Sequence, residues 1–155
     1  MKKIIIYTDG SSRGNPGAGG FGALLMFENH KKEIAQGYRF TTNNRMELLA
    51  VIVALQQLKT KDIPVEIYTD SQYVVYSVEK KWLNSWLKNN FKGGKKNKDL
   101  WLKYAELAKQ FSIKFHWVKG HANNPYNNRC DELATAAADN KKNLLIDEVY
   151  EKGEA

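Results

Sequence analysis

The sequence contains a single cysteine, Cys130, and no apolar run longer than the eight residues 48–55. One cysteine excludes an intrachain disulfide and a multi-cysteine metal site. The run is far shorter than the roughly 20 residues that a membrane-spanning helix needs, so we expect no membrane partner. The apolar stretch after Lys2 and Lys3 ends at Thr8, too early for a secretory signal, and we therefore expect a cytoplasmic protein.

Acidic residues are missing from one stretch of the chain, residues 80–98, which we call the basic segment. It contains seven lysines and no Asp or Glu, so it accounts for the whole formal net charge of +7. Such a run of like charges destabilises a compact fold unless an anion is nearby, which predicts a polyphosphate partner. The lysines are Lys80, Lys81, Lys88, Lys92, Lys95, Lys96 and Lys98.

The order of predicted elements is typical of an α/β fold with a mixed sheet and helices on its faces. Short β-branched and aromatic stretches predict strands at 3–9, 21–28, 33–41, 64–70 and 113–118. Helices are predicted at 44–58, 71–81, 82–88, 99–110 and 127–138, and a tight glycine-rich loop at 10–20. We expect one domain over residues 1–140 and a C-terminal tail, 141–155, that is partly docked or flexible.

Four carboxylates lie where predicted elements begin or end: Asp9, Glu47, Asp70 and Asp131. Each has an ordinary structural explanation, as a turn residue, half of a capping box with Asn44, a helix N-cap, or a charge in a first helical turn. If the first and fourth strands are neighbours, however, Asp9 and Asp70 converge at one edge. Clustered carboxylates suit Mg²⁺ or Mn²⁺, and two such ions about 3.5–4 Å apart promote phosphodiester hydrolysis.

Four separated segments resemble the signature of type 1 ribonuclease H, the bacterial ribonuclease HI family. They are Y-T-D-G-S-S-R-G-N-P-G at 7–17, T-T-N-N-R-M-E-L at 41–48, Y-T-D-S-Q-Y-V at 68–74, and W-V-K-G-H-A at 117–122 followed by N-R-C-D-E-L-A at 128–134. The resemblance implies a five-stranded mixed sheet, three antiparallel strands then parallel ones, with helices on both faces.

By this resemblance Asp9, Glu47, Asp70 and Asp131 are the catalytic carboxylates and bind two Mg²⁺ ions, for which Mn²⁺ can substitute. His121 is the mobile histidine that assists proton transfer or product release. The implied activity is endonucleolytic hydrolysis of the RNA strand of an RNA/DNA hybrid, leaving a 5′-phosphate and a 3′-hydroxyl.

The resemblance also implies substrate contacts. Asn15, Asn43, Asn44 and Gln72 match positions that read the minor groove of the hybrid, Thr42 one that holds a phosphate of the DNA strand, and Asn127 one that lines the catalytic site. The basic segment matches a protrusion that grips the DNA strand, with contacts from Trp82, Trp86, Lys88, Phe91, Lys92, Lys95, Lys96 and Lys98. Helix capping is the alternative for Thr42 and Asn44, and core packing is the alternative for the two tryptophans.

Two departures from the family pattern concern the basic segment. Phe91 stands where many bacterial members have tryptophan, and the segment around Gly93-Gly94 is shorter than usual. The resemblance therefore supports the predicted reaction more directly than it supports the substrate affinity and its salt dependence. A catalytically silent module that binds hybrids or duplexes is the alternative function. A related nuclease acting on DNA junctions, or one derived from a reverse transcriptase, is an alternative within enzymes. We expect a monomer without an obligate protein partner.

Overall fold

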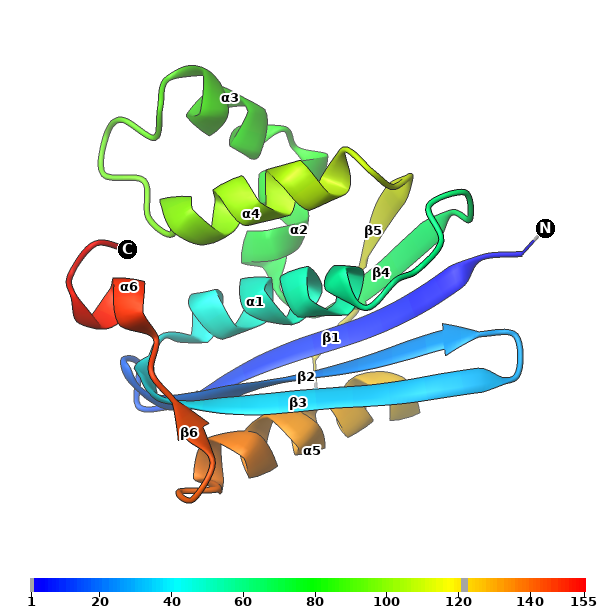
Figure 1. The fold of residues 1–155 in the computed structure, drawn as a ribbon, viewed down its shortest axis with the longest axis horizontal. Helices are drawn as coiled ribbons and strands as arrows, with labels where there is room; N and C mark the ends of the chain where they lie inside the picture. Colours follow the sequence, from blue (N-terminus) through cyan, green and yellow to red (C-terminus); the bar gives the residue numbers. More distant parts are fainter. Residues whose placement is uncertain (1, 121–122) are drawn as a thin grey trace.

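The computed structural model describes residues 2–120 and 123–155. Its centre is one six-stranded sheet in the order β5-β4-β1-β2-β3-β6 (Figure 1). The strands are β1 (Ile4–Arg13), β2 (Gly17–Phe27), β3 (His30–Thr41), β4 (Val65–Thr69), β5 (Ile113–Trp117) and β6 (Leu144–Leu145). The helices are α1 (Asn43–Gln56), α2 (Gln72–Glu79), α3 (Trp82–Lys88), α4 (Lys98–Ala108), α5 (Pro125–Asp139) and α6 (Glu148–Glu151).

The sheet is mixed, as predicted: β1, β2 and β3 pair antiparallel, and β4 and β5 continue parallel to β1. It has one strand more than expected, because Leu144 and Leu145 pair with Gly37 and Tyr38 at the edge of β3. Helix α1 covers one face and α5 the other (Figure 1). Among the described residues no helix is long and apolar enough to cross a membrane.

Helix α1 is buried between two layers, which explains why its sequence is apolar almost all round. It packs against β1 and β2 on one side and against α4 on the other. Leu48, Val51, Ile52 and Leu55 are all at most 1% exposed and belong to one core with Ile6 and other strand residues. The predicted central position of this helix is confirmed, and it fixes the start of α1 against β1.

The glycine-rich stretch predicted as a loop at 10–20 is instead largely sheet, and that prediction was wrong. Strand β1 continues through Asp9 to Arg13, and β2 begins at Gly17. The glycines are there because α5 lies very close to the sheet. A Cβ atom added to Gly20 would lie 2.5 Å from the backbone oxygen of Ala134 in α5, and one added to Gly22 would lie 2.6 Å from the oxygen of Cys130.

The helix caps differ in part from those predicted. Of the two residues for which capping was the alternative, Thr42 caps α1 and Asn44 does not; Oγ1 of Thr42 accepts from the backbone N of Arg45 at 3.2 Å. Ser71, not Asp70, caps α2, accepting from the backbone N of Val74 at 3.2 Å. Helix α5 begins at Pro125 with Asn124 as its cap, two residues before the predicted start.

These corrections remove the ordinary structural explanations for the four carboxylates. Asp9 lies inside a strand, not in a turn, and Glu47 lies too far along α1 for a capping box with Thr42. Asp70 does not cap α2, and Asp131 lies in the second turn of α5, beyond the first-turn position that favours acids.

Candidate active site

Three carboxylates from separate elements meet at one place in the structure. Asp9 comes from the middle of β1, Glu47 from α1, and Asp70 directly follows β4. One oxygen of each lies within 4.8 Å of the others. The predicted pairing of the first and fourth strands is confirmed, with Thr8 opposite Thr69, and it places Asp70 beside Asp9.

The fourth predicted carboxylate, Asp131, lines the same cavity from α5 but is not within that 4.8 Å group. The cavity has a volume of about 420 Å³. Its lining residues are Asp9, Gly10, Ser11, Asn43, Glu47, Asp70, Asn127 and Asp131. The structure therefore brings all four predicted carboxylates, together with Asn43 and Asn127, to one cavity.

Burial and mutual repulsion disfavour the ionised form of the carboxylates in this cluster. Burial, and then the charges of Asp70 and Asp131, raise the pKa of Asp9 to about 8, although the backbone N of Gly10 donates to its Oδ1 at 2.9 Å. Burial and the charges of Asp9 and Asp70 raise the pKa of Glu47 well above its ordinary value. Among the described residues, the buried Oε1 of Glu47 finds no hydrogen-bond partner.

These observations fit a divalent metal centre. Three oxygens within 4.8 Å of one another, one of them buried without a partner, are hard ligands that lack the positive charge they need. A cation would satisfy the orphaned oxygen and offset the repulsion that raises both pKa values. Asp9, Glu47 and Asp70 are therefore the residues that would hold the metal, with Asp131 beside them.

Beside the cluster, β1 packs tightly against the start of α1. A Cβ atom added to Gly10 would lie 2.4 Å from the backbone N of Glu47, so only glycine lets β1 approach the start of α1 this closely. The indole Nε1 of Trp117 donates to the backbone oxygen of Asp70 at 3.1 Å. Gly120 lies against the carboxylate of Asp70, whereas the predicted catalytic His121 lies outside the described residues.

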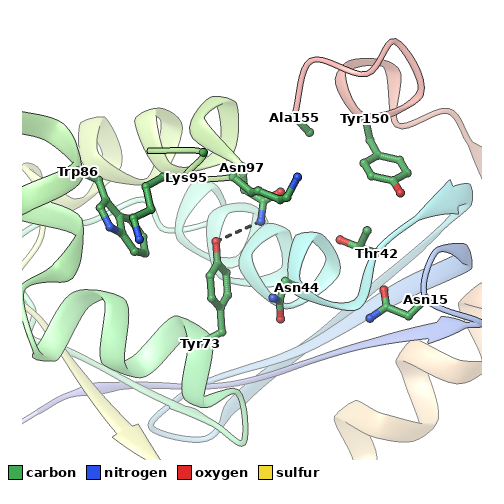
Figure 2. Close-up of a pocket in the computed structure, with 11 residues that line it drawn as sticks. Asn15, Thr42, Asn44, Tyr73, Trp86, Lys95, Asn97, Tyr150 and Ala155 are labelled. Atoms are coloured by element: carbon green, nitrogen blue, oxygen red, sulfur yellow. Dashed lines mark hydrogen bonds between the residues drawn. The ribbon is translucent and has the colours of Figure 1, made fainter. Parts of the chain in front are cut away.

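A second cavity has a volume of about 510 Å³ (Figure 2). We call it the groove. In Figure 2 three predicted substrate residues, Asn15, Thr42 and Asn44, lie on one side, and Trp86 and Lys95 of the basic segment lie on the other. Lys96 also lines the groove. The backbone N of Asn43, which lines the carboxylate cavity, donates to Oδ1 of Asn15 at 3.1 Å, so the two cavities share a wall. Gln72 lines neither cavity and is exposed at the start of α2.

The aromatic residues of the basic segment do not share one environment. Trp82 is 44% exposed, whereas Phe91 is only 7% exposed and belongs to the core. Phe91 is thus a packing residue, and the expectation of a direct contact with substrate has no support at this position. Trp86 packs against the core and also lines the groove. The centroid of its ring lies 6.0 Å from that of Trp101.

The lysines of the basic segment remain available to an anion. Lys88, Lys92, Lys95 and Lys96 are exposed, while Lys98 is half-buried and its Nζ donates to Asn90 at 2.8 Å. Gly93 and Gly94 both adopt a left-handed backbone with open space around them, which lets the chain turn between the lysines.

The groove residues that were not predicted from the sequence include Tyr73, Asn97 and Tyr150. The hydroxyl of Tyr73 accepts from Nδ2 of Asn97 at 3.1 Å (Figure 2). It also accepts from Nε1 of Trp101 at 2.7 Å. Tyr73 stands next to Gln72 inside a recognised segment and was open to prediction. Tyr150 gave no such signal, because it lies in the stretch assigned to a tail.

The comparisons with known proteins agree with this geometry. The family model described as RNase H matches residues 1–139, and the chain belongs to the RNase H family. It is 50% identical over 151 residues to a protein named Ribonuclease H from Desulforamulus reducens, covering 95% of this chain and 94% of the relative. A Ribonuclease H from Clostridium botulinum is 52% identical over 146 residues, covering 90% of this chain and 97% of the relative.

Solved structures point the same way. LC9-RNase H1, described as a type 1 RNase H with the type 2 active-site motif, superposes with a TM-score of 0.81 at 27% identity, covering 100% of this chain and 82% of that one. LC11-RNase H1, solved in complex with an RNA/DNA hybrid, gives a TM-score of 0.71 at 30% identity, covering 88% and 97%. The class of enzyme is thus a ribonuclease H, as the sequence segments predicted.

Proposed function

We propose that this chain cuts the RNA strand of RNA/DNA hybrids internally, leaving a 5′-phosphate and a 3′-hydroxyl, with two Mg²⁺ ions held by Asp9, Glu47, Asp70 and Asp131. The observation that carries the proposal is the cluster of three carboxylates within 4.8 Å beside a groove flanked by lysines. The hybrid seen in the complex of LC11-RNase H1 supports this choice of substrate.

The chain's own residues divide the work between the two cavities. When bound, the metal ions supply a nucleophilic water at neutral pH and stabilise the charge on the leaving oxygen. The four carboxylates fix the place where the scissile phosphate sits. Asn127, buried in the same cavity with an Oδ1 that no described residue satisfies, is placed to orient a water or a ribose hydroxyl there.

Selection of the hybrid needs contacts to both strands. The amides of Asn43, Asn44 and Asn15 present donors and acceptors along the wall between the cavities, where they would meet the 2′-hydroxyls and base edges of a minor groove. We assign Gln72 to the same surface. Thr42 and the lysines of the groove would hold phosphates of the DNA strand, which places that strand in the groove and the RNA strand over the carboxylates.

The proposal extends to the oligomeric state, the cellular location and the metal. We infer a monomer that acts in the cytoplasm with Mg²⁺ as its cofactor, for which Mn²⁺ can substitute. Residues 1–140 form the catalytic domain. Cys130 is a buried free cysteine whose thiol donates to the backbone oxygen of Tyr7. The fold therefore does not rely on a disulfide bond, which would need an oxidising compartment to form. His121 would assist proton transfer or product release.

An end-labelled substrate panel tests the proposal. The protein is incubated with an RNA/DNA hybrid, single-stranded RNA, double-stranded RNA and double-stranded DNA, each with Mg²⁺, with Mn²⁺ and with EDTA. We expect metal-dependent cutting of the hybrid's RNA strand alone. Binding of the hybrid without cutting in either metal would favour the catalytically silent module, and cutting of DNA junctions would favour the related nuclease.

A further inference from the structure

The C-terminal segment, residues 144–155, forms part of the groove wall. Tyr150 of α6 lines the groove together with Thr42 and Lys95. In Figure 2 its ring projects from the C-terminal turn towards the side of the groove that holds Thr42. An aromatic side chain with a hydroxyl thus stands in the groove proposed for the DNA strand, on the side facing the basic segment.

Several contacts hold this segment against the rest of the fold. The carboxylate of Asp147 accepts from Nε of Arg45 at 2.7 Å and from Oγ1 of Thr41 at 2.7 Å, and all three residues are buried. Strand β6 pairs with β3 just before Asp147. These anchors lie within four residues of the start of α6, so the position of Tyr150 is fixed before any ligand arrives.

The ring of Tyr150 has its own support. Its centroid lies 5.6 Å from that of Phe40, which is 43% exposed on β3. On the same turn, the carboxylate of Glu151 accepts from Nε of Arg39 at 2.9 Å. That pairing offsets the negative charge of Glu151, the acid next to Tyr150.

We propose that Tyr150 is a substrate-binding residue that contacts the sugar-phosphate backbone of the uncut strand. Its hydroxyl donates to a phosphate oxygen, while its ring packs on the adjoining deoxyribose. This inference rests on the proposed function, because it assumes that the DNA strand lies in the groove. Tyrosine suits the task, since it brings a rigid apolar ring and a polar tip with few rotatable bonds.

The test compares Tyr150→Phe and Tyr150→Ala with the wild type, using KM and kcat for a hybrid in Mg²⁺. Loss of the hydroxyl should raise KM about threefold, and loss of the ring about tenfold. Values of kcat should change less than about twofold, because the residue does not touch the cut strand. Leu145→Ala, at a 48% exposed position in the same segment, is the matched control and should behave as wild type.

A second measurement locates the contact. Phosphates of the DNA strand are replaced one at a time by uncharged methylphosphonates. At one position the wild type should lose affinity, while Tyr150→Phe, which already lacks the donor, should lose almost nothing further.

The outcomes separate the two proposals. If the wild type cuts no hybrid, the proposed function fails. If it cuts hybrid but both Tyr150 variants keep the wild-type KM, or if Leu145→Ala raises KM equally, the role of Tyr150 is overturned while the proposed function stands. A fall in kcat at constant KM would also overturn it.

Discussion

Glu47 is 5% exposed, and its Oε1 has no partner among the described residues, which is an expensive position for a carboxylate. Asp9, 4% exposed, stands beside it under the charges of Asp70 and Asp131. Nothing in the fold requires acids at these positions, since the caps and turns around them are made by other residues. The cost is explained by the metal chemistry that the cluster allows.

Replacing Asp9 by Asn should separate activity from stability. We expect cleavage of a hybrid in Mg²⁺ to fall by at least about 100-fold, because a metal ligand is lost. The metal-free protein should become more stable by about 1 kcal/mol, since a buried carboxylate under repulsion is removed. Initial rates and urea unfolding in EDTA measure the two effects, and turnover near the wild-type rate would refute the assignment of Asp9.

The same cluster should make the metal-free protein less stable as the pH rises. The pKa of Asp9 is about 8 in the folded state against an ordinary value of 3.8, so the folded protein holds a proton that the unfolded chain has released. Stability should therefore be greatest below about pH 4 with respect to this group and decline until about pH 8. The raised pKa of Glu47 acts in the same direction.

Urea unfolding in EDTA at pH 5 and pH 8 measures this decline. Over that interval the carboxyls whose pKa is lowered, such as Asp99 and Glu33, are ionised in both states and contribute little. Saturating Mg²⁺ should reduce the decline, because it binds the ionised cluster. Equal stability at both pH values in EDTA would contradict the raised pKa values.

At this scale the sequence pointed through its segments to the four carboxylates that line the cavity, but it did not settle the neighbouring caps. Asn44 and Thr42 are both good cap residues, so the sequence left both open; the structure uses Thr42 for α1, and Ser71 instead of Asp70 for α2. Gly93 and Gly94 both have positive φ, a backbone that glycine adopts without a steric cost, so the turn between the lysines is encoded locally.

At the scale of elements, Arg45 joins three of them. From α1 it bonds Asp99 at the start of α4 at 2.7 Å and Asp147 before α6 at 2.7 Å, and it is 2% exposed. Arg39 joins β3 to α6 through Glu151 at 2.8 Å, but on the surface. The two arginines thus attach the same C-terminal segment from the inside and from the outside.

Their substitution by Gln should have unequal effects on stability. Arg45→Gln leaves a buried carboxylate without its partner and should lower the free energy of unfolding by about 3–5 kcal/mol. Arg39→Gln removes an exposed pair and should cost less than about 1 kcal/mol. Urea unfolding at pH 7 measures both. Equal losses in the two variants would contradict the structural importance assigned to Arg45.

Element types were predictable and element ends were less so. The strands at β4 and β5 and the helix at α3 agree with their predicted ranges to within one residue, because Pro64 and the tryptophan spacing mark them locally. The extensions of β1 and β2 were not visible, since serine and glycine favour loops. Close packing under α5, a contact more than a hundred residues away in the sequence, overrides that preference.

The whole molecule carries its excess positive charge on one side of the groove, in the basic segment. Replacing Lys92, Lys95 and Lys96 together by Gln should weaken hybrid binding. It should also flatten the plot of log affinity against log salt by up to about 0.9 for each phosphate that the variant no longer neutralises. The rate at saturating substrate should stay constant, because the carboxylates are untouched.

Fluorescence anisotropy with a labelled hybrid, at several salt concentrations in EDTA, measures that slope. Lys59→Gln with Lys61→Gln is the matched control, as both lysines are exposed between α1 and β4 and line neither cavity. An unchanged slope in the triple variant would assign the basic segment another role.

The antiparallel β1–β2–β3 part of the sheet is covered by α5, which also brings Asp131. During synthesis the chain therefore contains Asp9, Glu47 and Asp70 well before α5, the helix that covers this face of the sheet and carries Asp131. At about 5–20 residues per second, several seconds separate Asp70 from Asp131. A growing chain on the ribosome, surrounded by nucleic acid, has no finished nuclease until α5 has been synthesised.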